Sequence, residues 1–105
     1  MPQFDVYRNE NTASRDRFPF LVAVQADLLE GLDTCVVIPL GTDAQLTDFP
    51  ARYLTPVIPF RGKSYALLTP QLAGISREEL GPLTGSLADQ ERVISAAVEF
   101  MIRGF

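Results

Sequence analysis

The chain has 105 residues, of which 47% are apolar, and a formal net charge of −4. This size and composition predict one globular domain over residues 1–105 with its own core, and the negative charge argues against a free-standing nucleic-acid binder. There is no histidine and only one cysteine, so we expect no metal and no cofactor. The N-terminus has no apolar signal core and no run is long enough to span a bilayer, so we expect a cytoplasmic protein without membrane contacts.

Three strands are predicted in the first forty residues. Residues 3–8 alternate apolar and polar side chains at the period of a half-buried strand. Residues 18–25 form the second strand, and residues 34–40 are apolar enough to predict burial on both faces of the third. Cys35 lies in this last run, where we expect a small buried hydrophobe. Pro39 cannot donate to a ladder, which predicts an edge or a bulge.

Two connections between these strands carry residues suited to binding. The polar residues 9–17 predict a loop, with Arg15 and Arg17 inside it and Arg8 just before it. These arginines form either a solvated surface or a basic site for an acidic partner. The acidic turn over residues 26–33 contains more leucine than a turn needs, namely Leu28, Leu29 and Leu32. The leucines either cover an edge of the core or belong to an interface.

The second half of the chain begins with a long connection over residues 41–53 and a hairpin. Residues 54–60 and 64–69 predict two strands, because the turn Arg61-Gly62-Lys63 places a glycine in a short polar segment between apolar runs. The hairpin brings the number of predicted strands to five.

The segment between the hairpin and the end of the chain has weaker patterns. Ser76 and Glu79 have the spacing of a capping box, which predicts a short helical turn. Gly81, Pro82 and Gly85 then predict a break in regular structure.

The clearest element is a helix predicted over residues 86–105. Ser86 is a favourable N-cap and Gly104 a favourable C-terminal stop. Glu99 and Arg103 have the spacing of an ion pair on a helix surface. Apolar residues recur with the helical period and predict one buried face, formed by Leu87, Val93, Ile94, Ala97, Val98, Met101 and Ile102. Phe105 either folds back onto the core or belongs to a contact surface made by two copies of this helix end.

These elements predict a fold that is mainly β with one C-terminal helix. Successive strands with short turns favour an antiparallel meander that curls into a small barrel or half-barrel, with the helix packed on it. No nucleophile motif, phosphate loop or metal cluster is present in the sequence. The residues therefore favour protein binding, and we do not expect an enzyme.

Several segments, taken in order, resemble the CcdB family of gyrase-poisoning toxins from bacterial toxin–antitoxin pairs. The similarity extends from Gln3-Phe4 to the terminal helix, and only the first loop and residues 74–85 match poorly. The matching segments are Val22-Ala23-Val24-Gln25-Ala26-Asp27-Leu28-Leu29, Val37-Ile38-Pro39-Leu40, Tyr53-Leu54-Thr55-Pro56-Val57-Ile58, Leu68-Thr69-Pro70-Gln71-Leu72-Ala73 and Gly104-Phe105.

The resemblance implies an SH3-like small antiparallel barrel that forms a homodimer. It implies that the two helix ends bind the DNA gyrase A subunit and trap the enzyme with its DNA cut. The gyrase-facing residues carried over by position are Leu28, Leu29, Glu99, Ile102, Arg103, Gly104 and Phe105. A CcdA-like antitoxin with a disordered tail would wrap the strands and the first loop, with Arg8, Arg15 and Arg17 as its contacts.

One departure from the family concerns the last three residues. Well-known members end Trp-Gly-Ile, with the tryptophan on a gyrase arginine, whereas this chain ends Arg103-Gly104-Phe105. An arginine there removes the aromatic platform and adds like-charge repulsion. Two alternatives follow: a MazF-like ribonuclease toxin on a similar barrel, which would need a basic groove for RNA, or a non-poisoning relative that only binds the antitoxin and takes part in operon autoregulation.

Overall fold

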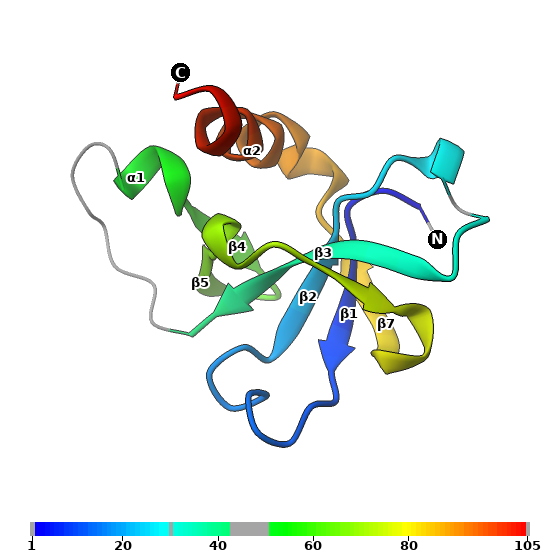
Figure 1. Ribbon diagram of the computed structural model, residues 1–105. Coiled ribbons are helices and arrows are strands. Elements are labelled where there is room, and N and C mark those ends of the chain that lie inside the picture. The colour runs from blue at the N-terminus through cyan, green and yellow to red at the C-terminus, as the bar shows by residue number, and fades with distance from the viewer. Residues whose placement is uncertain (1, 30, 43–50, 105) are drawn as a thin grey trace.

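The computed structural model describes residues 2–29, 31–42 and 51–104, and within them a mainly antiparallel sheet curls into a half-barrel with one C-terminal helix packed on it (Figure 1). The predicted fold class is confirmed. The strands are β1 (Asp5–Asn9), β2 (Phe20–Ala23), β3 (Thr34–Gly41), β4 (Val57–Phe60), β5 (Lys63–Leu67), β6 (Ala73–Ser76) and β7 (Leu80–Ser86). The helices are α1 (Ala51–Leu54) and α2 (Glu91–Arg103), with 3₁₀ turns at Asp27–Leu29, Thr69–Gln71, Arg77–Glu79 and Ala88–Gln90.

Strand β3 is the centre of the sheet. The strand order is β4-β5-β3-β2-β1-β7, and β6 also pairs with β3. One edge of β3 pairs with β2, while the other pairs first with β6 over residues 34–37 and then with β5 at Leu40 and Gly41. Pro39 lies where β3 changes partner, and its carbonyl accepts from the amide of Leu68 at 3.0 Å. The proline therefore occupies an interruption of one ladder and not an outer edge, and its missing donor is tolerated there.

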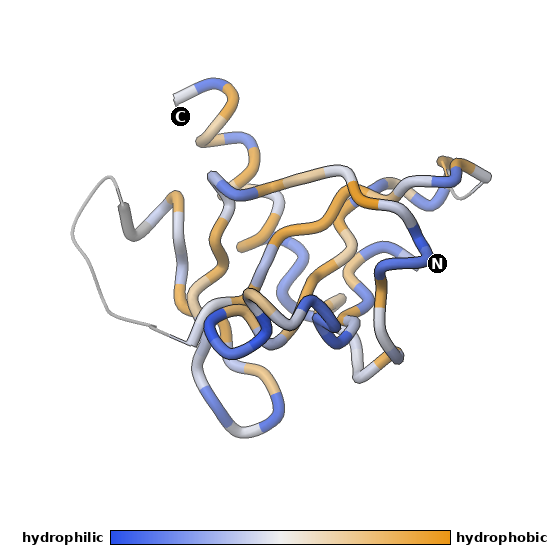
Figure 2. Tube along the Cα trace, turned by 60° about the horizontal axis from the view of Figure 1, so that its bottom comes forward, coloured by the Kyte–Doolittle hydropathy of each residue, from blue (hydrophilic) through white to orange (hydrophobic). Residues whose placement is uncertain are grey.

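Both faces of the central strands are apolar. On one face Val22, Ile38 and Leu40 join the main core with Ile94 and Ala97 of α2. On the other face a smaller cluster contains buried Leu21, Ala23, Cys35 and Val37. The expected burial of the third strand on both sides and the buried position of Cys35 are confirmed, and Figure 2 shows the apolar run along the central strands.

The predicted hairpin is the turn between β4 and β5. Phe60 pairs with Lys63, which leaves Arg61 and Gly62 as the loop. Both have positive φ, 52° and 78°, as a type I′ turn requires. The strand predicted from residue 54 starts later, at Val57, because Leu54 belongs to α1. The sequence did not predict α1, which falls at the end of the expected long connection.

Helix α2 has the predicted C-terminal end and a later start than predicted. Gly104 is left-handed, with φ 81°, and its amide donates to the carbonyl of Phe100 at 2.8 Å. The Ser86 hydroxyl does accept from the amide of Ala88 at 3.1 Å. However, a 3₁₀ turn follows, and the α-helix begins only at Glu91. Ser86 thus caps the entry to the helix and not the helix itself.

The predicted apolar face of α2 is only partly buried. Ile94 and Ala97 are buried, as is Leu87 just before the helix. Val93 is 40% exposed, Met101 36% and Ile102 71%. The prediction that all of these residues form one buried face is therefore wrong. The second half of α2 extends past the sheet towards α1, and the apolar residues there have too little of the core beneath them to be covered (Figure 1).

Strand β7 corrects the prediction that Gly81, Pro82 and Gly85 break regular structure, because all three lie within it. Gly81 allows β7 to approach β1, because a Cβ at Gly81 would lie 2.6 Å from the carbonyl oxygen of Arg8. The register of β7 on β1 is irregular, and β7 ends the main strand path, a position in which Pro82 is tolerated. The predicted capping box is confirmed between β6 and β7, where Ser76 and Glu79 exchange side-chain and main-chain bonds.

Candidate partner-binding surfaces

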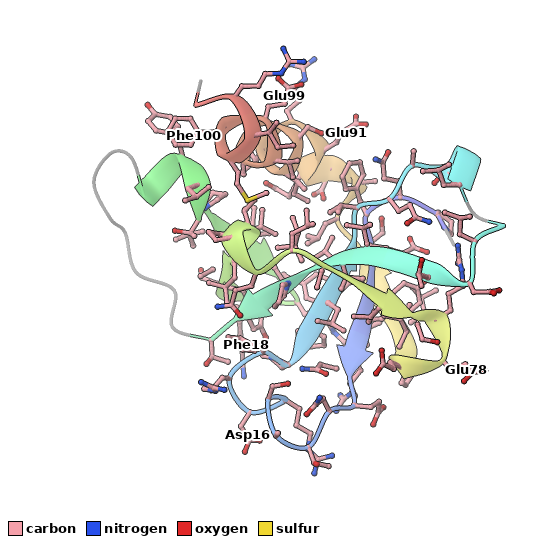
Figure 3. All side chains as sticks on the ribbon, viewed as in Figure 1. Asp16, Phe18, Glu78, Glu91, Glu99 and Phe100 are labelled. Atoms are coloured by element: carbon pink, nitrogen blue, oxygen red, sulfur yellow. The ribbon has the colours of Figure 1, made fainter. Side chains whose placement is uncertain are left out.

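The last turns of α2 form an exposed surface with α1, which we call the helix-end surface. It contains Tyr53, Glu99, Phe100, Met101, Ile102, Arg103 and Gly104. The rings of Tyr53 and Phe100 pack with centroids 6.0 Å apart, which ties α1 to α2. Glu99 points away from the sheet (Figure 3), and Ile102 is the most exposed large apolar side chain among the described residues. Tyr53 and Met101 are exposed as well, and a group of exposed apolar side chains flanked by charges suits a contact with another protein.

The residues expected to face gyrase do not all come together. Glu99, Ile102, Arg103 and Gly104 share the helix-end surface. Leu29 is 47% exposed on the 3₁₀ turn Asp27–Leu29, which lies at the far end of the molecule from the end of α2 in Figures 1 and 2. The side chain of Leu28 and the whole of Phe105 lie outside the described residues. A single protomer thus presents two separate parts of the expected site.

The loop between β1 and β2 is held by Asn9, which the sequence reasoning did not single out. This residue is 6% exposed. Its Nδ2 donates to the Ser14 hydroxyl at 3.0 Å and to the Phe18 carbonyl at 2.8 Å, and its Oδ1 accepts from the amide of Asn11 at 3.0 Å. An asparagine at a strand end, followed by turn-forming residues, is the sequence pattern that would have indicated these side-chain hydrogen bonds across the loop. The bonds give the loop a defined shape.

The three arginines expected to meet the antitoxin lie in or beside the loop that Asn9 holds, and all three are exposed. Arg8 and Arg15 line one hollow of about 230 Å³, and Arg15 and Lys63 line a neighbouring one of about 480 Å³. Arg17 packs on Phe18, with its Cζ 5.1 Å from the ring centroid, a cation–π distance. The loop therefore places Arg8 and Arg15 along one hollow, which Glu10 and Asp16 also line, while Arg17 packs on Phe18.

A third hollow, of about 380 Å³, lies on the face of the sheet formed by the smaller apolar cluster. We call it the acidic groove, because Glu10, Glu78 and Glu79 line it above an apolar floor that includes Leu21, Val37 and Ile75. The sequence did not indicate this groove, because part of its lining comes from β6, a strand that the sequence did not predict, and from the turn after it. Within residues 2–29, 31–42 and 51–104 no three metal-ligating side chains gather, and no helix is long and apolar enough to cross a membrane.

Two titratable groups lie under this face and predict an alkaline loss of stability. Burial raises the pKa of the Cys35 thiol against the opposing charge of Arg77. Burial, followed by the charges of Asp5 and Cys35, raises the pKa of Tyr7, again against Arg77. The unfolded chain then loses these protons first, so the free energy of unfolding should fall as the pH rises past about 8.5 and again past about 10, the ordinary pKa values of the two groups.

Urea unfolding followed by circular dichroism from neutral to alkaline pH measures this loss. Cys35→Ala should flatten the first part of the decline and Tyr7→Phe the second. An unchanged slope in both variants would contradict the assignment.

Comparison with known proteins agrees with the fold described above. The family model described as CcdB protein matches residues 3–104, which is nearly the whole chain. The chain therefore belongs to the CcdB family, a family of toxins from toxin–antitoxin pairs. A solved structure described as an endoribonuclease in complex with its cognate antitoxin, from mycobacterial species, is similar in fold, with a TM-score of 0.74 over 97% of this chain and 94% of that one. The two chains share 12% sequence identity, a level at which the likeness shows the fold alone.

Proposed function

We propose that the chain is a toxin that binds the DNA gyrase A subunit through the helix-end surface and holds the enzyme with its DNA cleaved. The single observation that carries this proposal is the 71% exposure of Ile102 on the helix that otherwise anchors the core. Glu99 and Arg103 stand beside it and are also exposed. The proposed action is binding and not catalysis: a protein that binds one conformation of gyrase preferentially raises the population of that conformation. No cofactor takes part, and the place of action is the cytoplasm.

A homodimer is part of this proposal. The separation of Leu29 from the end of α2 supports it, because both can face one gyrase surface only if a second copy places its own turn or helix end nearby. Val93 and Met101, exposed at 40% and 36%, add apolar surface along α2 that a partner copy would cover.

An antitoxin of the CcdA type is the second proposed partner. Family membership supports it, and so does the endoribonuclease of similar fold, whose structure is described as a complex with its cognate antitoxin. Arg8 and Arg15, brought together beside the loop, suit acidic groups of a tail that folds on binding. Arg17 on Phe18 adds a third cation nearby.

The arginine at position 103 gives a direct test of the gyrase contact. Arg103→Trp should raise the affinity for a gyrase A subunit of the common type by about 5- to 30-fold, since it replaces like-charge repulsion with a cation–π contact worth about 1–2 kcal/mol. Isothermal titration with the purified gyrase A subunit measures the change. Arg92→Trp, at an exposed site near the start of the same helix, is the matched control and should change nothing. Equal affinities for the chain and the Arg103→Trp variant would place the contact elsewhere.

A further inference from the structure

The acidic groove has an apolar floor built from three strands. Leu21 of β2 and Val37 of β3 belong to the smaller apolar cluster, and Ile75 of β6 packs against it. Ala73 and Ile75, alternate residues of β6, both line the hollow of about 380 Å³. This volume is in the range of about 300–1,000 Å³ typical of ligand pockets, so the groove can take a few side chains of a partner.

Three carboxylates gather along the groove, and one of them, Glu10, is distant in sequence from the other two. Glu10 follows β1, and Glu78 and Glu79 lie in the turn after β6. The Glu10 side chain crosses over Gly81, since a Cβ there would lie 2.7 Å from its Oε1. The glycine therefore permits the approach that brings Glu10 towards the other two carboxylates.

The cations near this face do not line the groove. Among the described residues that line it there is no lysine or arginine. Arg77 donates from Nε to the Leu32 carbonyl, and its main-chain amide donates to the Asp33 carbonyl, so Arg77 is bound to the segment before β3. Arg8 lines the neighbouring hollow, which Glu10 also lines, and Arg17 packs on Phe18. The groove is thus an apolar site with an excess of negative charge.

Strand β6 offers the outward-facing main-chain groups of Gly74 to an extended partner, whereas the Ser76 amide already donates to Glu79 Oε2 at 3.2 Å. Among the described strands it pairs only with β3. A segment in extended conformation can pair with such an edge while its alternate side chains enter the pocket. This favours a peptide over a small organic cation as the occupant.

We propose that the acidic groove binds an extended peptide segment in which a basic side chain is flanked by apolar ones, and that this segment belongs to the antitoxin. The inference rests on the proposed toxin–antitoxin function and extends it. It assigns the antitoxin both signs of charge: acidic groups for Arg8 and Arg15, and a cation for Glu10 and Glu78. Both surfaces border the loop held by Asn9, so one tail can reach them in succession.

The test uses the full chain, labelled with ¹⁵N, and two short synthetic peptides, acetyl-Leu-Arg-Val-Leu-amide and the same peptide with norleucine in place of arginine. Titration should move the amide signals of Val37, Ala73, Ile75 and Glu78. The arginine peptide should bind about tenfold more tightly, because each exposed carboxylate contributes a small favourable term. Its advantage should shrink at high salt, which screens these charges.

Variants that remove a carboxylate charge with little change in side-chain shape test whether the peptides bind in the acidic groove. Glu10→Gln combined with Glu78→Gln should remove most of the advantage of the arginine peptide, while Glu79 is kept because it caps its own turn. Asp89→Asn combined with Glu91→Gln is the matched control, with the same change in net charge. Asp89 lies in the 3₁₀ turn before α2, and Glu91, the first residue of α2, lies on the other side of the molecule from Glu78 (Figure 3). Ala73→Arg, at an exposed lining position, should place a cation in the groove and block both peptides.

Equal binding of the two peptides, or signal changes confined to α1 and α2, would overturn the inference. So would a groove covered by a second copy of the chain, seen as protection of the Gly74 amide, which faces away from β3, in the free dimer. The outcome is independent of gyrase. A chain that poisons gyrase but ignores both peptides would refute the groove alone, whereas a chain that binds the arginine peptide but leaves gyrase untouched would refute the gyrase proposal alone.

Discussion

Removal of residues 103–105 is expected to leave the chain folded and to abolish gyrase binding. The buried residues of the last helix are Ile94 and Ala97, about two turns before the cut, whereas Arg103 and Gly104 are exposed. The truncation removes the left-handed cap at Gly104 and a cation near the helix C-terminus, with a cost of about 1 kcal/mol or less. The loss of contact residues from the proposed interface should instead remove binding altogether.

Thermal unfolding and titration with the gyrase A subunit, run on the same samples, measure the two effects. A truncated chain that fails to fold would mean that Phe105 belongs to the core, which is the other reading of the sequence. A truncated chain that folds and still binds gyrase would mean that the contact does not involve the end of α2.

Ile94→Ala is expected to lower the stability of the chain, whereas Ile102→Ala, the same substitution on the same helix, is expected to weaken gyrase binding and leave stability nearly unchanged. Ile94 is 1% exposed in the main core, so its truncation should cost about 2–5 kcal/mol. This is a large part of the roughly 5–15 kcal/mol that stabilises a typical domain. Ile102 is 71% exposed, so its truncation should leave stability within about 0.5 kcal/mol and weaken gyrase binding.

Urea unfolding followed by circular dichroism compares the stabilities of this pair, since the chain contains no tryptophan to report by fluorescence. Binding is compared at a temperature at which Ile94→Ala remains folded. If Ile102→Ala unfolds as readily as Ile94→Ala, the end of α2 is part of the core and the helix-end surface is not free. If it binds gyrase as tightly as the parent chain, the exposed isoleucine has another role.

The sequence predicted the elements whose determinants are local. The turn at Arg61 and Gly62, the capping box at Ser76 and the stop at Gly104 each depend on a few adjacent residues, and all are present in the structure. The burial of β3 on both faces was also predictable, because its apolar run leaves no polar side to face water.

The elements that the sequence did not predict depend on distant partners. Strand β7 contains Gly81, Pro82 and Gly85, which oppose strand formation locally, but its pairing with β1 overrides that preference. The exposure of Ile102 could not be predicted either, because helical periodicity shows which face of a helix is apolar but not how far the core extends beneath that face.

In the candidate surfaces, too, the sequence predicted what depends on adjacent residues and missed what depends on distant ones. The arginines near the loop were predicted as a group, and in the structure Arg8 and Arg15 line one hollow while Arg17 packs on Phe18. The acidic groove joins Glu10 to Glu78 across most of the sequence, and this pairing follows only from the position of β7 beside β1. Leu29 and the end of α2 were expected on one surface, and the separation between them within one protomer is a finding of the structure.

The proposed trapping of gyrase on cleaved DNA can be observed in cells. The chain and its truncation lacking residues 103–105 are expressed in a sensitive bacterium to equal levels, and plasmid DNA is scored for linear molecules after detergent lysis. We predict growth arrest with linear plasmid for the full chain and neither effect for the truncation. Normal growth with folded, abundant full chain, or arrest with intact plasmid and cleaved RNA, would contradict the proposal.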